Sequence, residues 1–364
     1  MSTTARDFYR QPALAVIAIF TLSLAQAQVP TRADDAQTKL RGLIDGYRAT
    51  QMLHVVAKLR IADHLQQGPL SVKELAKRTS THEDSLYRLL RTLAGLGVFA
   101  EEEGPRFRLT PMAELLRTGV PGSQQVSAQA AGEPFMWRPW GHLTHSISTG
   151  EVAFDNLYGK HTWEWFAENP GPAQIFNSLM DEGTATETRA VLAGYDFSGA
   201  QTIVDIGGGR GVLMSAVLSK SASVKGILFD LPHVIEAAKK EVPPELAARI
   251  QFTPGDFFKA APAGGDIYLL KNIIHDWTDA ESGKILAVIL SAMKGRGRML
   301  LVENIVCEPN QICRGKMSDI QMMVRNGGRN RTEKEYRDLL RAHGFEITRV
   351  IATAGPSVIE AIPR

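Results

Sequence analysis

The spacing of apolar residues in the first third of the chain predicts helices followed by a hairpin. Apolar positions recur every three or four residues over 36–65, which predicts one amphipathic helix there. Ser71 followed by Glu74 predicts a capping box at the start of a short helix. A further helical pattern begins near Glu83, and β-rich runs on both sides of Gly104 predict a hairpin. This order of elements is typical of a winged helix.

Residues 120–190 are rich in aromatic side chains. A helical cap over an active site has this composition, and so does an ordinary hydrophobic core. For any single aromatic residue we favour the core interpretation.

From Gln201 onward, short β-rich runs alternate with helical stretches. The β-rich runs are 202–206, 224–229, 250–253, 267–270 and 299–302, and the helical stretches between them are 212–219, 233–240 and 280–293. This alternation predicts an α/β domain, a Rossmann-like fold with a doubly wound and mostly parallel sheet. Ligands of such sheets bind at the carboxyl ends of the strands.

These patterns divide the chain into four expected parts. They are a hydrophobic leader over 1–30, an α-helical winged-helix domain over 31–120, a helical linker or cap over 121–195, and the α/β domain over 196–364. The length of 364 residues fits two domains and a leader.

Composition argues against a polyelectrolyte partner. The apolar share of 44% and the charged share of 22% are ordinary for a globular protein, and the formal net charge is +2. We therefore expect neither nucleic acid nor a membrane as a partner. A winged-helix DNA-binding regulator is the alternative, but the second helix mixes Glu83 and Asp84 with Arg88 and Arg91 and lacks a basic stripe. The cysteines, Cys307 and Cys313, form no CxxC pair and fit unlinked, inert thiols of a reducing compartment.

Glycines follow the first strand of the α/β domain in the pattern D-x-G-x-G-x-G, from Asp205 to Gly211. The pattern differs from the dinucleotide fingerprint, because Val212 stands where a third glycine is required. A glycine-rich loop alone also fits a structural turn. Two acidic residues at neighbouring strand ends favour a ligand site. Asp230 ends the next strand, where a carboxylate can bind ribose hydroxyls. Asp256 follows the third strand, where a carboxylate can bind an adenine amine.

Five segments together carry a resemblance to a known family. They are VDIGGGRG (204–211), FDLPHV (229–234), GDFF (255–258), LKNIIHDW (270–277) and GGRNRT (327–332). In order and spacing they resemble the S-adenosylmethionine-dependent O-methyltransferases of the plant caffeate and acetylserotonin type, with their bacterial relatives, over residues 36–364. The resemblance implies a class I methyltransferase fold, S-adenosyl-L-methionine as co-substrate without a metal, and a small, aromatic hydroxyl acceptor. It also implies a homodimer formed through the N-terminal domain.

The resemblance also implies a role for particular residues. His275 would be the general base, with Glu303 and Asp276 orienting and stabilising its imidazole. The residues implied in cofactor binding are Asp205, Gly207, Gly208, Gly209, Asp230, Leu231, Gly255, Asp256, Phe257 and Lys271. The residues implied in the acceptor pocket are Phe176, Met180, Trp277 and Asn330, with His161, Trp163, Met317 and Met322 as looser candidates.

One position departs from the family pattern. Asn330 stands where members commonly carry a glutamate beside the base. An amide can hydrogen-bond a histidine but cannot balance its charge, so we expect a less basic His275 or an acceptor with an already acidic hydroxyl. A family member that binds S-adenosylmethionine but catalyses hydroxylation or cyclisation is the alternative that Asn330 leaves open.

The first residues have the pattern of a secretory signal peptide. Arg6 and Arg10 precede an apolar run over 13–25, and residues 25–27 resemble a cleavage site. The alternative is an N-terminus extended beyond the true start, with Val29 as a candidate start. Because S-adenosylmethionine is made in the cytoplasm, we favour the second interpretation and expect a cytoplasmic protein.

Overall fold

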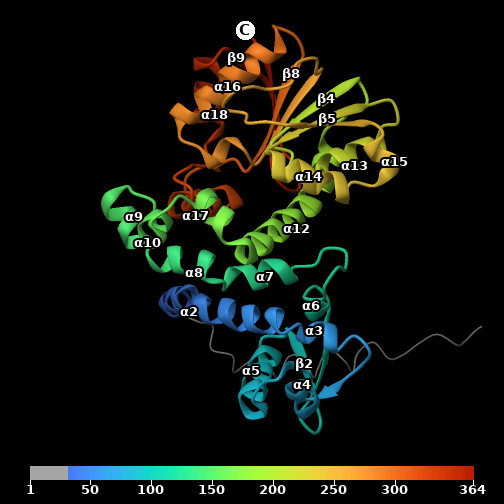
Figure 1. Cartoon of the computed structure of the whole chain (residues 1–364). Helices are drawn as coiled ribbons and strands as arrows, with labels where there is room; N and C mark the ends of the chain where they lie inside the picture. The colour runs from blue at the N-terminus through green and yellow to red at the C-terminus, as the bar shows by residue number, and fades with distance from the viewer. Residues whose placement is uncertain (1–31) are drawn as a thin grey trace, which may run out of the picture. The chain divides into compact units, whose positions relative to one another are not determined.

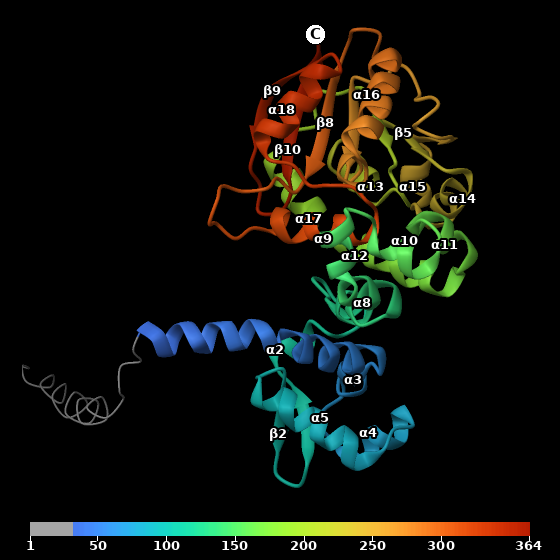
Figure 2. The ribbon, with the colours of Figure 1, turned by 90° about the vertical axis from the view of Figure 1, so that its left-hand side faces the viewer.

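The computed structural model describes residues 32–364, with side chains from residue 35 onward. Contacts divide the chain into two units, the first ending at Thr50 and the second spanning Gln51–Arg364. The predicted leader over 1–30, including its signal-like pattern over 1–27, lies outside the described residues. Figures 1 and 2 show the chain in two views.

The first unit contributes the beginning of a long helix, α2 (Arg32–Lys58). Its large apolar side chains are exposed, namely Leu40, Leu43, Ile44 and Tyr47. The prediction of one helix over 36–65 is wrong at its end. Arg60 has a left-handed backbone with φ 51°, which a right-handed helix cannot contain, so the chain turns there before α3 (Ile61–His64).

The second unit opens with the predicted winged helix. Its elements are β1 (Leu70–Ser71), α4 (Val72–Thr79), α5 (Glu83–Gly95), β2 (Phe99–Glu102) and β3 (Arg106–Leu109). The strands form a sheet in the order β1-β3-β2. Ser71 and Glu74 form the predicted capping box on α4. Leu75, Leu90 and Phe107 are fully buried and hold the helices against the hairpin.

Short helices connect this module to the α/β domain. They are α6 (Pro111–Glu114), α7 (Gln125–Ala131), α8 (Pro134–Gly141), α9 (Leu143–Thr149), α10 (Ala153–Tyr158) and α11 (Thr162–Glu168), followed by the long α12 (Pro170–Gly194). Aromatic residues of this region pack on one another, with the rings of Phe166 and Phe176 stacked at 4.8 Å between centroids. These aromatics therefore form a core of their own.

A seven-stranded sheet forms the centre of the α/β domain. Its strands are β4 (Thr202–Ile206), β5 (Lys225–Asp230), β6 (Ile250–Pro254), β7 (Ile267–Lys271), β8 (Arg298–Glu303), β9 (Phe345–Ile351) and β10 (Ser357–Pro363). Their order is β6-β5-β4-β7-β8-β10-β9, and the strands from β6 to β8 are parallel. From β4 the chain first builds one half of the sheet and then returns to β7 on the other side. The carboxyl ends of β4 and β7 thus flank the switch point where such sheets bind ligands.

Helices cover both faces of this sheet (Figure 1). The end of α12 packs on one face with α13 (Val212–Lys220) and α14 (Pro232–Glu241), and α15 (Pro244–Ala247) lies beside them. The other face is covered by α16 (Asp279–Met293) and α18 (Glu333–Ala342). The predicted doubly wound, Rossmann-like fold is confirmed.

Two features of the C-terminal part were not predicted. β10 is antiparallel to β8 and to β9, so the sheet is mixed at this edge. The connection from β8 to α17 (Arg314–Arg325) contains a disulfide between Cys307 and Cys313, whose Cα atoms are 6.1 Å apart. The expectation of two unlinked thiols is therefore wrong, because the loop folds back on itself and brings the two side chains together.

Within residues 32–364, no helix combines the length and the hydropathy that crossing a bilayer requires.

Candidate functional site

The glycine loop after β4 is shaped by its backbone. Gly207 and Gly209 have φ values of 66° and 59°, a region that glycine enters at no steric cost. A Cβ at Gly207 would lie 2.5 Å from Cδ1 of Ile273, and one at Gly208 would lie 2.4 Å from Cδ1 of Leu228. A Cβ at Gly209 would meet no atom within 4 Å. The loop is thus packed tightly at Gly207 and Gly208, and it leaves open space at Gly209.

Asp230 closes this loop from the end of β5. One carboxylate oxygen, Oδ2, accepts a hydrogen bond from the backbone N–H of Gly209 at 2.9 Å, and Oδ1 accepts one from the N–H of Leu231 at 2.7 Å. Burial raises the pKa of Asp230, and these two backbone donors act against the rise. Each oxygen keeps a lone pair, so the carboxylate can accept further hydrogen bonds.

Asp205 lies beneath the loop. Asp205 is almost fully buried, and its Oδ2 would lie 2.8 Å from a Cβ at Gly208. Burial raises the pKa of Asp205 to about 7, with a further upward contribution from Asp230 and a downward one from Lys271. The sequence-predicted residues Asp230 and Lys271 therefore both lie within electrostatic reach of Asp205.

Lys271 ends β7 and is tied to α12. Its Nζ lies 2.8 Å from Oε2 of Glu187, which is buried, and donates to Oγ1 of Thr184 at 3.1 Å. The other oxygen of Glu187 pairs with Arg314 at 3.1 Å. Thr184 and Glu187 were not among the residues predicted from the sequence. Helical spacing held a signal for them, since they follow Met180 by four and seven residues on the same helix.

Arg210, the charged residue of the glycine loop, forms ion pairs with other residues of the chain. Its Nη2 pairs with Asp181 of α12, and its Nη1 with Glu241 of α14 at 2.9 Å. The arginine therefore fastens the loop to two helices.

Aromatic rings gather after β6. Phe257 and Phe258 both pack against Trp277, with ring centroids 6.1 and 4.7 Å apart in edge-to-face arrangements. Asp256 accepts the backbone N–H of Phe258 at 2.9 Å, and this bond lowers the pKa of Asp256. Trp277, predicted for the acceptor pocket, thus lies beside two residues predicted for cofactor binding.

His275 lies in a short 3-10 helix, η1 (Ile274–Asp276), directly after the carboxyl end of β7. Its Nδ1 is 2.6 Å from Oε2 of Glu303, the fully buried last residue of β8. The other oxygen, Oε1, accepts the backbone N–H of Ile274 at 3.0 Å. A carboxylate only accepts hydrogen bonds, so Nδ1 carries the proton and Nε2 is left as the basic nitrogen.

Two carboxylates set the basicity of His275. Asp276 Oδ1 lies 3.7 Å from Nε2 and accepts a hydrogen bond from Nδ2 of Asn326 at 2.6 Å. Burial acts to lower the pKa of His275, but Glu303 and then Asp276 stabilise the imidazolium and the net pKa is raised. The two carboxylates therefore favour the protonated imidazolium.

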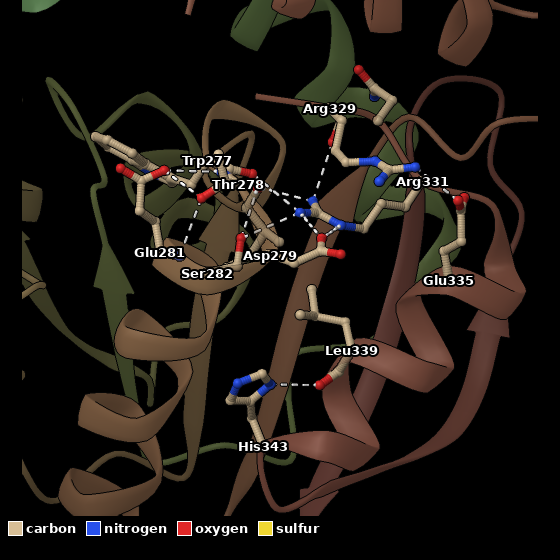
Figure 3. A network of polar contacts seen from close by, with 12 residues as sticks. Trp277, Thr278, Asp279, Glu281, Ser282, Arg329, Arg331, Glu335, Leu339 and His343 are labelled. Atoms are coloured by element: carbon tan, nitrogen blue, oxygen red, sulfur yellow. Dashed lines mark hydrogen bonds and ion pairs between the residues drawn. The ribbon is translucent and has the colours of Figure 1, made fainter. Parts of the chain in front are cut away.

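A buried arginine fixes the main chain around His275. Arg331 is 1% exposed and pairs with Asp279 at 2.6 Å. It also donates to the backbone carbonyls of Ile274 at 3.2 Å and Trp277 at 3.1 Å. Figure 3 shows this network between α16 and α18. Arg331 thereby holds both ends of the segment that carries His275.

The predicted acceptor residues occupy different environments. Phe176 is buried in the aromatic core, whereas Met180, one turn further along α12, is 41% exposed. Asn330 is buried, and its Nδ2 donates to the backbone carbonyl of Asn304 at 2.8 Å. Its Oδ1 has no hydrogen-bond partner among the described residues. Within residues 32–364, Asn330 makes no hydrogen bond with the imidazole of His275.

In the part of the chain that the structure describes, no three His, Cys, Asp or Glu side chains are grouped to hold a metal ion.

Two family patterns match this chain. The O-methyltransferase domain matches residues 140–346, more than half of the chain, and the O-methyltransferase dimerisation domain matches residues 42–119.

Individual proteins of known activity are similar along nearly the whole chain. The phenazine O-methyltransferase PhzM of Lysobacter antibioticus is 40% identical over 323 residues, which cover 88% of this chain and 94% of that protein. The 3-amino-4-hydroxybenzoate 4-O-methyltransferase of Streptomyces cremeus is 37% identical over 320 residues, 87% of each chain. The crystal structure of human N-acetylserotonin methyltransferase in complex with S-adenosylmethionine superposes with a TM-score of 0.84 at 26% identity, covering 93% of this chain and 99% of that one.

The fold, the glycine loop, the acidic strand ends and these matches agree. The chain belongs to the O-methyltransferase family, and it is an S-adenosylmethionine-dependent O-methyltransferase.

Proposed function

We propose that the protein transfers the methyl group of S-adenosylmethionine to a hydroxyl of a small aromatic acceptor, with Nε2 of His275 as the general base. The observation that carries this proposal is the pairing of Nδ1 of His275 with the buried carboxylate of Glu303 at 2.6 Å. This pairing fixes the tautomer and leaves the basic nitrogen at the ligand-binding edge of the sheet.

The residues of this edge suit the methyl donor. S-adenosylmethionine supplies a methyl group on a positively charged sulfur when it is bound. Asp230, with a free lone pair on each oxygen, would accept the ribose hydroxyls, and Asp256 would accept the adenine amine beside Phe257. The open space at Gly209 lets the backbone approach a ligand. Asp230 and Asp256 place carboxylates at this edge without a phosphate cradle, which matches a cationic donor.

His275 removes the acceptor's proton as the methyl group is transferred. An unperturbed phenol has a pKa of about 10, so it is a weak nucleophile while protonated. Nε2 accepts the proton as the oxygen–methyl bond forms and the sulfur–methyl bond breaks. The resulting imidazolium has Glu303 on Nδ1 and Asp276 near Nε2, which both stabilise it. The rest of the acceleration comes from holding the oxygen in line with the methyl group.

An aromatic acceptor fits the wall next to this edge. Phe176 and, one turn further, Met180 belong to α12 and would line the acceptor pocket. The rings of Phe166 and Trp163 pack against Phe176. The names of the relatives point to the same class, because they include a phenazine and a hydroxybenzoate O-methyltransferase.

The N-terminal module would form a homodimer. The dimerisation family covers residues 42–119, and exposed apolar side chains on the first part of α2 suit a protein interface. In this division, residues 31–120 dimerise, 121–195 form the acceptor wall and 196–364 bind the methyl donor. Light scattering after size exclusion should give the mass of two chains.

The decisive experiment incubates the pure protein with methyl-labelled S-adenosylmethionine and a panel of phenols and hydroxyindoles. Mass spectrometry should find the label on oxygen. Calorimetry on the same preparation should detect uptake of S-adenosylmethionine by the ligand-free protein. Uptake without any labelled oxygen product would favour the hydroxylating or cyclising alternative, and no uptake would contradict the assignment of the edge.

A further inference from the structure

Arg325, the last residue of α17, is a buried cation that the proposed reaction does not use. It is 4% exposed. Its backbone carbonyl accepts a hydrogen bond from the buried Oγ1 of Thr162 at 2.5 Å, and its Nε donates to Oδ1 of Asn326 at 2.9 Å. Its main chain and the Nε of its side chain are thus each held by another buried group.

The guanidinium lies on the acceptor side of the proposed base. Its central carbon is 4.7 Å from the centre of the Phe176 ring. Its charge also reaches the other side of the site, where it acts against the net rise in the pKa of both His275 and Asp276. Arg325 therefore lies between an acceptor-wall ring and the atoms that handle the proton.

The charge of Arg325 is poorly compensated within the protein. In residues 32–364, no carboxylate lies within 4 Å of its guanidinium, and only Nε has a hydrogen-bond acceptor. Burial lowers the pKa of Arg325, and Asp276 opposes this effect only in part. Arg331 provides the contrast, because its guanidinium is equally buried but pairs with Asp279 and several carbonyls. A buried charge is almost always paired, so the two free Nη groups of Arg325 point to a partner from outside the chain.

We propose that Arg325 binds an acidic group of the acceptor, so that the acceptor is a hydroxylated aromatic carboxylic acid. This inference rests on the proposed function, because it takes the acceptor to lie against Phe176 beside His275. The planar fork of a guanidinium matches a carboxylate in a bidentate manner, and the acceptor ring would occupy the space between Phe176 and the base. Arg325 is then a specificity-determining residue.

Binding to the complex with S-adenosylhomocysteine tests this inference without any methyl transfer. Calorimetry should compare a hydroxynaphthoic acid with its carboxamide, which has nearly the same shape and no charge. The wild-type protein should bind the acid about ten- to a hundredfold more tightly than the amide. Arg325→Met should abolish this preference, whereas Arg325→Lys should retain part of it because the charge remains.

Arg329→Met is the matched control, since Arg329 is a half-exposed arginine on the same segment that pairs with Glu335. It should leave the preference for the acid unchanged. Because the ratio of acid to amide is measured within each variant, a general loss of folded protein does not alter it. Equal binding of the two probes, no binding of the acid, or an unchanged ratio in Arg325→Met would overturn the inference.

The two proposals fail in different ways. A preference for the acid that depends on Arg325, without labelled oxygen product, would uphold the acidic-group site and contradict methyl transfer to such acceptors. Efficient labelling of neutral phenols with no effect of Arg325→Met would do the reverse.

Discussion

Two buried carboxylates on neighbouring strands of the sheet serve different ends. Glu303 ends β8 at the ligand-binding edge, and Glu360 lies on the adjacent β10, paired in register with Leu300 of β8. Glu303 contacts one imidazole and one backbone N–H. Glu360 instead accepts hydrogen bonds from Tyr195 at 2.6 Å, from Arg349 at 3.0 Å and from Arg298 at 3.3 Å.

The carboxylate of Glu360 is surrounded by hydrogen-bond donors from the protein itself. Although burial acts to raise its pKa, the hydrogen bonds from Arg349, Tyr195, Thr348 and Arg298 lower it to about 2. A hollow of about 470 Å³ opens beside it, lined among others by Asp266 and Arg298. The polar groups there are already occupied, since Asp266 accepts the backbone N–H groups of Gln201 and Thr202.

The comparison separates a structural carboxylate from one that supports chemistry. A carboxylate held by several fixed cations keeps one protonation state at all physiological pH values. A carboxylate paired with a histidine has a partner that can gain and lose a proton, so the charge of the pair can change during a reaction. Burial and a large hollow are therefore weaker indicators of a site than a titratable partner.

Removing the base should have the largest effect. His275→Ala should lower turnover by about 10²- to 10⁴-fold, because no other group replaces Nε2 as proton acceptor. Steady-state kinetics with labelled S-adenosylmethionine measures this loss, and uptake of the donor should persist. His343→Gln is the control, since His343 bonds the Leu339 carbonyl away from the edge. Full turnover in His275→Ala would show that proximity alone suffices.

Glu303→Gln should lower turnover by about 10- to 100-fold and change its pH dependence. Rate requires neutral His275, so it rises with pH through the pKa of that group, which Glu303 helps to raise above its usual value of 6.5. Without the carboxylate this pKa falls, and the acidic limb of the rate profile should move to lower pH. A limb that stays in place in Glu303→Gln would mean that Glu303 does not set the basicity of His275.

Glu360→Gln should affect stability and spare turnover. The folded-state pKa of about 2 lies below the ordinary 4.5, so the ionised carboxylate stabilises the fold above pH 4.5 and loses this contribution as pH falls toward 2. We expect the variant to lose about 2 kcal/mol of unfolding free energy at neutral pH. Urea unfolding at several pH values should show the gap to wild type closing in acid. An equal loss in Glu346→Gln, whose half-exposed carboxylate pairs with Arg341 at 2.9 Å, would count against the network.

Asn330→Glu should change turnover only slightly. The family residue restores a carboxylate, but Nδ2 of Asn330 donates to the carbonyl of Asn304, and a glutamate cannot. We expect turnover within a few-fold of wild type or better, with a loss of about 1–3 kcal/mol in unfolding free energy. Thermal unfolding alongside kinetics checks both parts. A collapse of turnover in a folded variant would show that the amide itself is needed.

Much of the fold followed from local patterns. The capping box at Ser71 and the alternation of strands and helices after Gln201 depend on neighbours along the chain, and both are confirmed. The helix break at Arg60 and the antiparallel β10 did not follow. Apolar spacing continues through a single left-handed residue, and a strand's composition does not specify the direction of its partner.

The site divides in a similar way. Residues at strand ends, such as Asp230 and His275, follow from topology, because parallel strands end at one edge. Glu187 and Arg325 come from α12 and α17, whose placement depends on packing between distant segments. The disulfide was not predicted for the same reason, because the separation of two cysteines along the sequence does not determine the path of the loop between them.

Arg331 holds the catalytic segment through the backbone carbonyls of Ile274 and Trp277. Because every residue carries a backbone carbonyl, this anchoring does not depend on the identity of the side chains at positions 274 and 277. A combinatorial library at position 277 can thus explore new acceptors in the laboratory, provided that the arginine more than fifty residues downstream is left untouched.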